Sequence, residues 1–259
     1  MMLVWLDDLR LNAELAGPAT APPLVLIHGL GVDLAVWDAI LPCLAAHRTL
    51  RLDLRGHGQS DTPLAPYTMG ALIRDTERLM QHFALKDAVV LGAGEGGLVA
   101  QGLAVKRLDL FRSMVLTGSA TRFGNPDLWQ RRIAGLTDPG PDLEAEAAAL
   151  LGPRWRGMAT AGVVQQMLSR TRPDGWTGVA AAVANTDFYQ TTATLTLPTL
   201  ILAGGDDRKT PPDMQRETAD LVAGSDFHLL PGGSHLAMLT HPQPFAAALN
   251  AFLKRIGHV

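Results

Sequence analysis

Residues 89–99 read Val-Val-Leu-Gly-Ala-Gly-Glu-Gly-Gly-Leu-Val, an apolar run that passes through a glycine-rich turn into a second apolar segment. A short, continuously apolar run before glycine is typical of a strand covered on both faces. Residues 96–107 then show apolar spacing near 3.6, which indicates a helix. Glycines permit a sharp change of direction and close packing of the helix on the sheet. The stretch therefore predicts one strand-turn-helix unit of an α/β protein.

The same alternation extends along most of the chain and predicts an open, mostly parallel, doubly wound sheet. The predicted core strands are residues 24–27, 49–52, 88–91, 113–116, 199–202 and 227–230. The other predicted covering helices are residues 68–83, 211–222 and 242–256, with Thr68 and Pro242 at helix starts. Residues 3–6 and 9–14, joined by two aspartates, predict an antiparallel hairpin on the sheet edge.

The strand pattern stops between residues 121 and 196. This part is rich in helical stretches, which Asp138-Pro139-Gly140-Pro141 and Arg172-Pro173-Asp174-Gly175 interrupt. We therefore predict one α/β core, formed by residues 1–120 and 197–259, with a helical cap formed by residues 121–196. A chain of 259 residues can bury one such core.

The composition excludes several classes of protein. A balance of 22 basic and 25 acidic residues leaves no basic stripe for nucleic acid, and no stretch has the roughly 20 apolar residues of a membrane span. A single cysteine, Cys43, rules out an intramolecular disulfide and a cysteine-built metal site. Without a secretory signal at its start, the chain is expected to be cytoplasmic.

Two early turns resemble those of the α/β-hydrolase family. Residues 24–31 read Leu-Val-Leu-Ile-His-Gly-Leu-Gly, like the family's turn that supplies half of an oxyanion hole, and the resemblance makes the amide of Leu30 the donor. Residues 52–60 resemble the turn after the next strand, which supports the floor of the site. For Arg55 and His57 we therefore favour a structural role.

The turn in residues 89–99 occupies the place of the family's G-x-S-x-G nucleophile elbow, with Gly94 where the serine is expected. The amide of Glu95 would complete the oxyanion hole. Because acidic residues are stabilised near a helix start, we expect the Glu95 side chain to be a solvated, helix-start carboxylate. It would act as an acid or base if it faced the pocket.

Two later loops complete the resemblance. Residues 200–207 resemble the loop that bears the catalytic acid, and residues 230–235 resemble the loop that bears the catalytic histidine. Their order along the chain is that of the family. Asp207 is the better match for the acid than Asp206, and its role would be to orient His235 and stabilise the imidazolium.

Among hydrolases of this fold, nearly the whole chain resembles 3-oxoadipate enol-lactonases. The resemblance is carried by Gly17-Pro18 with residues 21–26, by Tyr67-Thr68, and by residues 120–124 followed by Trp129 and Arg132. It implies that the start of the cap helps to hold a small carboxylated lactone. Arg122 and Arg132 could then pair with a carboxylate and Trp129 could wall the pocket, although ordinary salt bridges and packing explain these residues equally well or better.

The glycines of residues 92–97 also have the G-x-G-x-x-G spacing of a dinucleotide-binding turn. That turn should follow the first strand of its sheet and precede an acidic residue about 20 positions later. This stretch lies in mid-chain, and Asp109 fits only loosely, so we favour the hydrolase interpretation.

Without a hydroxyl at residue 94, three functions remain open. The His235–Asp207 pair could be a general base on water or on an acidic substrate proton, in a hydrolase or in a lyase or cofactor-free oxygenase. The chain could be an ester or lactone hydrolase whose serine has been replaced, by engineering or by recent loss. It could also be a pseudo-hydrolase that binds without turnover. We expect a small-molecule substrate and no metal or organic cofactor, while the oligomeric state is not readable from the sequence.

Overall fold

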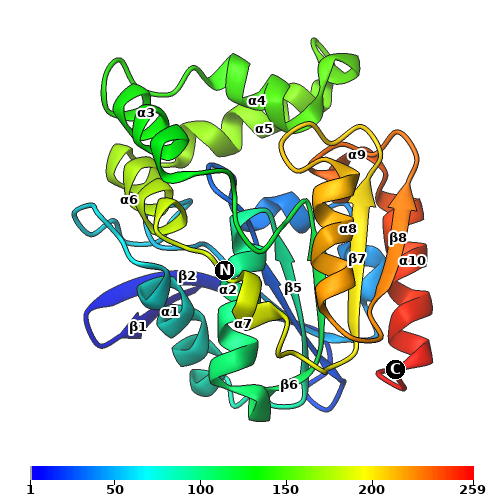
Figure 1. Cartoon of the computed structure of the whole chain (residues 1–259). Helices are drawn as coiled ribbons and strands as arrows, with labels where there is room; N and C mark the ends of the chain where they lie inside the picture. The colour runs from blue at the N-terminus through cyan, green and yellow to red at the C-terminus, as the bar shows by residue number, and fades with distance from the viewer. Residues whose placement is uncertain (1) are drawn as a thin grey trace.

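In the computed structural model, which describes residues 2–259, one mixed sheet of eight strands runs in the order β1-β2-β4-β3-β5-β6-β7-β8 (Figure 1). The strands are β1 (Met2–Leu6), β2 (Leu9–Ala16), β3 (Pro23–Ile27), β4 (Arg48–Leu52), β5 (Ala88–Ala93), β6 (Phe111–Thr117), β7 (Thr199–Gly204) and β8 (Asp226–Leu230). The hairpin β1–β2 pairs antiparallel, β2 pairs antiparallel with β4, and all later pairs are parallel. The predicted doubly wound α/β fold and its edge hairpin are confirmed.

The predicted helices of the core are confirmed as α1 (Met69–His82), α2 (Glu95–Lys106), α8 (Pro212–Leu221) and α10 (Pro242–Arg255). A short helix that was not predicted, α9 (Ala237–Thr240), precedes α10. Two short 3-10 helices, η1 (Leu34–Trp37) and η2 (Leu41–Leu44), follow β3, and a third, η3 (Leu108–Leu110), precedes β6. Thr68 caps α1 by accepting a hydrogen bond from the amide of Ala71, as its place at the helix start predicts.

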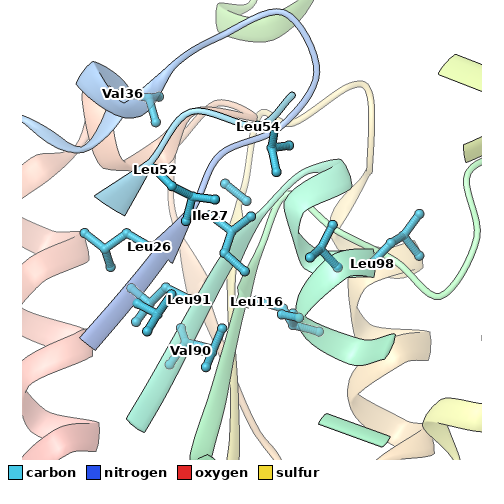
Figure 2. Packing of buried hydrophobic residues seen from close by; sticks show 14 of the residues in the cluster. Leu26, Ile27, Val36, Leu52, Leu54, Val90, Leu91, Leu98 and Leu116 are labelled. Carbon is cyan, nitrogen blue, oxygen red and sulfur yellow. The ribbon is translucent and has the colours of Figure 1, made fainter. Parts of the chain in front are cut away.

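Aliphatic side chains from both faces of the sheet form the core. Figure 2 shows Leu26 and Ile27 of β3 packed with Val90 and Leu91 of β5. Leu98 of α2 covers the same cluster and is fully buried. Burial on both faces explains why these strands read as continuous apolar runs.

One strand differs from its prediction. Residues 227–230 were expected to be covered on both faces, but β8 is the last strand of the sheet, and Leu229 is 44% exposed. That prediction was wrong because a short apolar run does not tell an edge strand from a central one. The local pattern is the same, and only the order of the strands decides the burial.

The chain between β6 and β7 is helical. It contains α3 (Pro126–Thr137), α4 (Leu143–Leu151), η4 (Pro153–Trp155), α5 (Ala159–Arg170), α6 (Pro173–Ala184) and α7 (Tyr189–Thr192). In Figure 1, α3 to α6 lie above the end of the sheet at which β5 and β7 finish, whereas α7 lies lower, beside α2. Within the described chain, no helix is long and apolar enough to cross a membrane.

Candidate active site

The turn between β5 and α2 needs glycine at its centre. Gly94 has φ +53° and ψ −127°, a backbone conformation that residues with a Cβ rarely adopt. A Cβ on Gly96 would lie 2.5 Å from the carbonyl oxygens of Ile27 and His28, so this turn packs directly against the end of β3. The sequence thus folds into a sharp elbow in which glycine relieves the backbone strain at residue 94 and in which residue 96 has no room for a side chain.

His235 lies next to Gly94. A Cβ built on Gly94 would be 3.3 Å from Nε2 of His235, and the ring is 3% exposed. Gly118, just after β6, makes room for the ring, since a Cβ there would come within 2.9 Å of its Nδ1. The structure therefore brings together Gly94 and His235, which are 141 positions apart in the sequence.

Asp207 holds the other side of this imidazole. Its Oδ2 is 3.0 Å from Nδ1 of His235, so a proton on Nδ1 leaves the lone pair of Nε2 directed at Gly94. The carboxylate also accepts hydrogen bonds from the amide and hydroxyl of Thr210 and from the side chain of Gln215. Burial raises the pKa of Asp207, but the charge of His235 and these hydrogen bonds outweigh burial and lower it.

Thr210 and Gln215 escaped the sequence analysis because they belong to no local motif. Gln215 on α8 also accepts a hydrogen bond from the amide of Gly118, so one side chain links the loop of the acid to the turn beneath the histidine ring. A polar residue at the start of the helix after the acid loop is the only signal that could have pointed to it. Polar residues at helix starts are too common for that signal to be specific.

The side chain of Glu95 is not where it was expected. The predicted solvated carboxylate is 2% exposed, and its Oε2 accepts a hydrogen bond of 2.8 Å from the amide of Leu30. A Cβ on Gly29 would be only 2.9 Å from that oxygen, so the carboxylate fits because residue 29 is glycine. The prediction was wrong because attraction to a helix start does not fix the direction of the side chain, and here it crosses to the loop after β3.

Glu95 is charged in this position. Burial raises the pKa of Glu95, but the charges of Lys209 and His235 and the amides of Leu30 and of Glu95 itself outweigh it, so the pKa lies below its ordinary value. The second carboxylate oxygen, Oε1, is buried and has no hydrogen-bonding partner within residues 2–259. The two amides that the sequence assigned to an oxyanion hole thus already have an anion beside them.

The turns after β3 and β4 form a separate hydrogen-bonded layer. Nε2 of His57 accepts from the amide of Gly31, and Nε2 of His28 accepts from the amide of Leu54. Arg55 makes a buried ion pair with Asp75 on α1, with 2.6 and 2.7 Å contacts. Burial lowers the pKa of His57 to about 3, so its ring is neutral. These contacts agree with the structural role expected for Arg55 and His57.

The cap residues that were proposed to bind substrate have other partners. Arg122 is exposed and pairs with Asp187, Arg132 pairs with Glu146, and the buried Trp129 donates its indole N–H to the carbonyl of Phe123. Arg132 also stacks over Trp129. For Trp129 and Arg132 the structure therefore gives packing and salt-bridge partners instead of a place on the pocket wall.

A cavity of about 660 Å³ opens beside the start of the cap. Residues 120–126, residues 183–187 with Tyr189, and Met214 and Glu217 of α8 line it. Arg122 is in that lining, but Gly94, Trp129, Arg132 and His235 are not. Above the loop after β3 the cap supplies a different cover, because a Cβ on Gly31 would lie 2.3 Å from the ring of Trp176 on α6. Like Thr210 and Gln215, Trp176 is a residue that no local motif could have singled out.

The sequence model of the alpha/beta hydrolase fold family matches residues 22–242 of this chain. The chain belongs to the α/β-hydrolase family. The turn at Gly94 follows β5, which comes after the parallel strands β3 and β4 along the chain, whereas a dinucleotide-binding turn follows the first parallel strand.

Relatives of this α/β-hydrolase carry the names of lactonases and esterases. It is 27% identical to 3-oxoadipate enol-lactonase 2 of Acinetobacter baylyi over 96% of this chain and 95% of that protein. It is 30% identical to the pimeloyl-[acyl-carrier protein] methyl ester esterase of Klebsiella pneumoniae, over 90% and 94% of the two chains. The crystal structure of an enol-lactonase from Burkholderia xenovorans matches with a TM-score of 0.93 and 26% identity, over 98% of this chain and all of that one. The resemblance to enol-lactonases is thus confirmed for the chain as a whole.

Proposed function

We propose that this α/β-hydrolase uses His235 and Asp207 as a general base in the hydrolysis of a small ester or lactone, without a covalent acyl-enzyme. The observation that carries the proposal is the 3.3 Å between Nε2 of His235 and the position of a Cβ on Gly94. A water molecule in the space of the absent hydroxyl would lie within hydrogen-bonding reach of Nε2. Asp207 would keep the ring in the required tautomer and stabilise the imidazolium.

In this mechanism His235 takes a proton from the water as the water oxygen attacks the acyl carbon. The oxyanion that develops would be stabilised by the amides of Leu30 and Glu95, after which the leaving oxygen takes the proton back from His235. The names of the relatives support an ester or lactone as substrate. Arg122 in the lining of the 660 Å³ cavity is a candidate partner for a substrate carboxylate.

A second function is favoured by the position of Glu95. A carboxylate on the amide of Leu30 opposes a second negative charge there, which suits binding without turnover or a non-hydrolytic proton transfer more than acyl chemistry. An oriented His235–Asp207 pair supports proton transfer over simple binding, since binding alone needs no general base.

The test compares hydrolysis of p-nitrophenyl esters and of an enol-lactone by the native chain and by His235→Ala. We expect the native chain to hydrolyse at least one of them and His235→Ala to lose at least about 100-fold in kcat/KM. His82→Ala, which removes an exposed histidine at the end of α1, is the matched control. Equal activity of the native chain and His235→Ala contradicts the proposal.

A further inference from the structure

The carboxylate of Glu95 binds the amide of Leu30, which in the proposed reaction stabilises the oxyanion of the substrate. Its Oε2 accepts from the amide of Leu30 at 2.8 Å, and the amide of Glu95 also favours the charged carboxylate. A carboxylate oxygen is a stronger acceptor than the carbonyl of a neutral ester, because a hydrogen bond to an ionised group is roughly twice as strong. In this state Glu95 outcompetes an ester for these donors.

The contact differs from an ordinary helix cap. A capping carboxylate binds amides of its own first turn, whereas Glu95 reaches a residue 65 positions away. A purely structural carboxylate would also have both oxygens paired, since buried polar atoms nearly always are. Oε1 of Glu95 is buried without a partner among the described residues.

We propose that Glu95 is a specificity-determining residue that acts as an internal ligand of the oxyanion hole, so that an acyl substrate binds productively only by displacing it. Removal of the carboxylate would expose a site for small carboxylates formed by the amides of Leu30 and residue 95. The first part rests on the proposed function, which assigns these amides to the oxyanion. The second part rests only on the geometry.

The local packing supports displacement over a permanent contact. Gly29 and Gly94 leave no side chain between Glu95, His235 and the loop after β3, so an oxygen of a ligand could take the place of Oε2. Lys209 has the largest favourable charge effect on Glu95 and forms no ion pair within residues 2–259. A displaced carboxylate would therefore still have a cation in its surroundings.

The first experiment reads the oxyanion hole in a serine-restored background. Gly94→Ser, Gly94→Ser/Glu95→Gln and Gly94→Ser/Glu95→Ala are labelled with a fluorophosphonate probe, and their second-order rates are compared. Since one oxyanion donor is worth roughly 10²- to 10³-fold, we expect the alanine double variant to react at least about 100-fold faster than Gly94→Ser alone. The glutamine variant should fall between them, because it removes the charge and keeps an acceptor near Leu30.

Gly94→Ser/Glu77→Ala is the matched control, since Glu77 is a carboxylate on α1 that pairs with Lys106 and Arg107 away from Gly94. It should label like Gly94→Ser. Equal rates for Gly94→Ser and its Glu95→Ala double variant overturn the proposal, as does the absence of labelling in all of the serine variants.

The second experiment needs neither serine nor turnover. Thermal unfolding of the native chain and of Glu95→Ala is followed in sodium acetate and in sodium chloride of equal ionic strength. Acetate should raise the unfolding midpoint of Glu95→Ala and leave that of the native chain unchanged, because a ligand that binds only the folded state stabilises it. Glu95→Ser replaces Glu95→Ala if the latter does not fold.

If acetate raises the unfolding midpoint of neither Glu95→Ala nor Glu95→Ser, the proposed carboxylate site is wrong. If the native chain hydrolyses no ester but acetate stabilises Glu95→Ala, the proposed function fails while the assignment of Glu95 stands. If esters are hydrolysed in a His235-dependent way, but Gly94→Ser/Glu95→Ala labels no faster than Gly94→Ser and Glu95→Ala binds no acetate, the proposed function stands and the assignment of Glu95 fails.

Discussion

Two groups of buried polar residues lie at the same end of the sheet and differ in how completely they are satisfied. The framework cluster consists of His28, Asp53, Arg55 and His57 on the turns after β3 and β4, together with Asp75 of α1. The elbow cluster consists of Glu95, Asp207 and His235, and the ring of His235 lies beside Gly94. Apart from Asp75, both clusters lie on segments that follow parallel strands.

In the framework cluster each side chain has its partners. Asp53 accepts from the side chain of Asn12 and from the amides of Leu34 and Gln59, and no atom of the cluster is buried without a hydrogen bond among the described residues. In the elbow cluster, Oε1 of Glu95 is buried without a partner among the described residues. The contact of His235 with Asp207 is made by Nδ1, which leaves Nε2 available to a ligand. A buried polar atom without a partner costs stability. The comparison separates residues that hold the loops from residues that are available for chemistry.

The largest expected effect is on the framework cluster. Arg55→Ala leaves the buried carboxylate of Asp75 without its cation and should lower the free energy of unfolding by about 3–5 kcal/mol. Urea denaturation measures it. Arg10→Ala, which removes an exposed ion pair with Asp61, is the control and should cost much less, because solvent screens the pair. Similar losses for the two variants would show that the buried Arg55–Asp75 pair contributes no more to stability than the exposed Arg10–Asp61 pair.

A smaller loss is expected at the elbow itself. Gly94→Ala forces a Cβ into the positive-φ conformation and should cost about 1–3 kcal/mol in urea denaturation. The comparison variant is Gly135→Ala on α3, where a Cβ would meet no atom within 4 Å. That change should stabilise the helix by up to about 1 kcal/mol. An elbow that tolerates alanine without loss would mean that residue 94 is not strained.

The charge of Glu95 should be visible in the pH dependence of stability. Because the folded pKa lies below the unfolded value of 4.5, ionisation contributes stability that is present above pH 4.5 and is lost as the pH falls through the folded pKa. The native chain should therefore lose stability faster than Glu95→Gln below pH 4.5. Chemical denaturation at a series of pH values measures the difference, with Asp127→Asn on α3 as the control for loss of a charge. Parallel curves for native chain and Glu95→Gln would show that Glu95 is uncharged or exposed.

The smallest stability effect is expected on the cap. Arg122 and Asp187 are both more than half exposed, so Arg122→Ala should change the free energy of unfolding by less than about 1 kcal/mol. If Arg122 binds a substrate carboxylate, the same variant should raise KM for a carboxylated ester and leave KM for an uncharged ester unchanged. Arg132→Ala, which breaks the pair with Glu146, serves as the control. Equal KM changes for both esters would remove Arg122 from the binding site.

Sequence patterns were sufficient for the strands, the helices of the core and the loops that carry Gly94, Asp207 and His235. These features depend on local periodicity and on glycine turns, which each segment carries by itself. The partners of Arg122, Arg132 and Trp129 were not predictable, because a long side chain can reach several neighbours and the packing of the cap selects one. Thr210, Gln215 and Trp176 were missed for the same reason, since no spacing along the chain marks their contacts.

The sequence by itself determined the α/β-hydrolase fold and the absence of a hydroxyl at residue 94, because both follow from residue identity and periodicity. Only the tertiary structure decided that the carboxylate of Glu95 turns away from solvent to the amide of Leu30, and that Nε2 of His235 is directed at the bare Gly94. Side-chain direction at a helix start is set by what lies across from it. Here that is a glycine loop 65 residues earlier in the chain, which leaves space for a carboxylate and offers it an N–H donor.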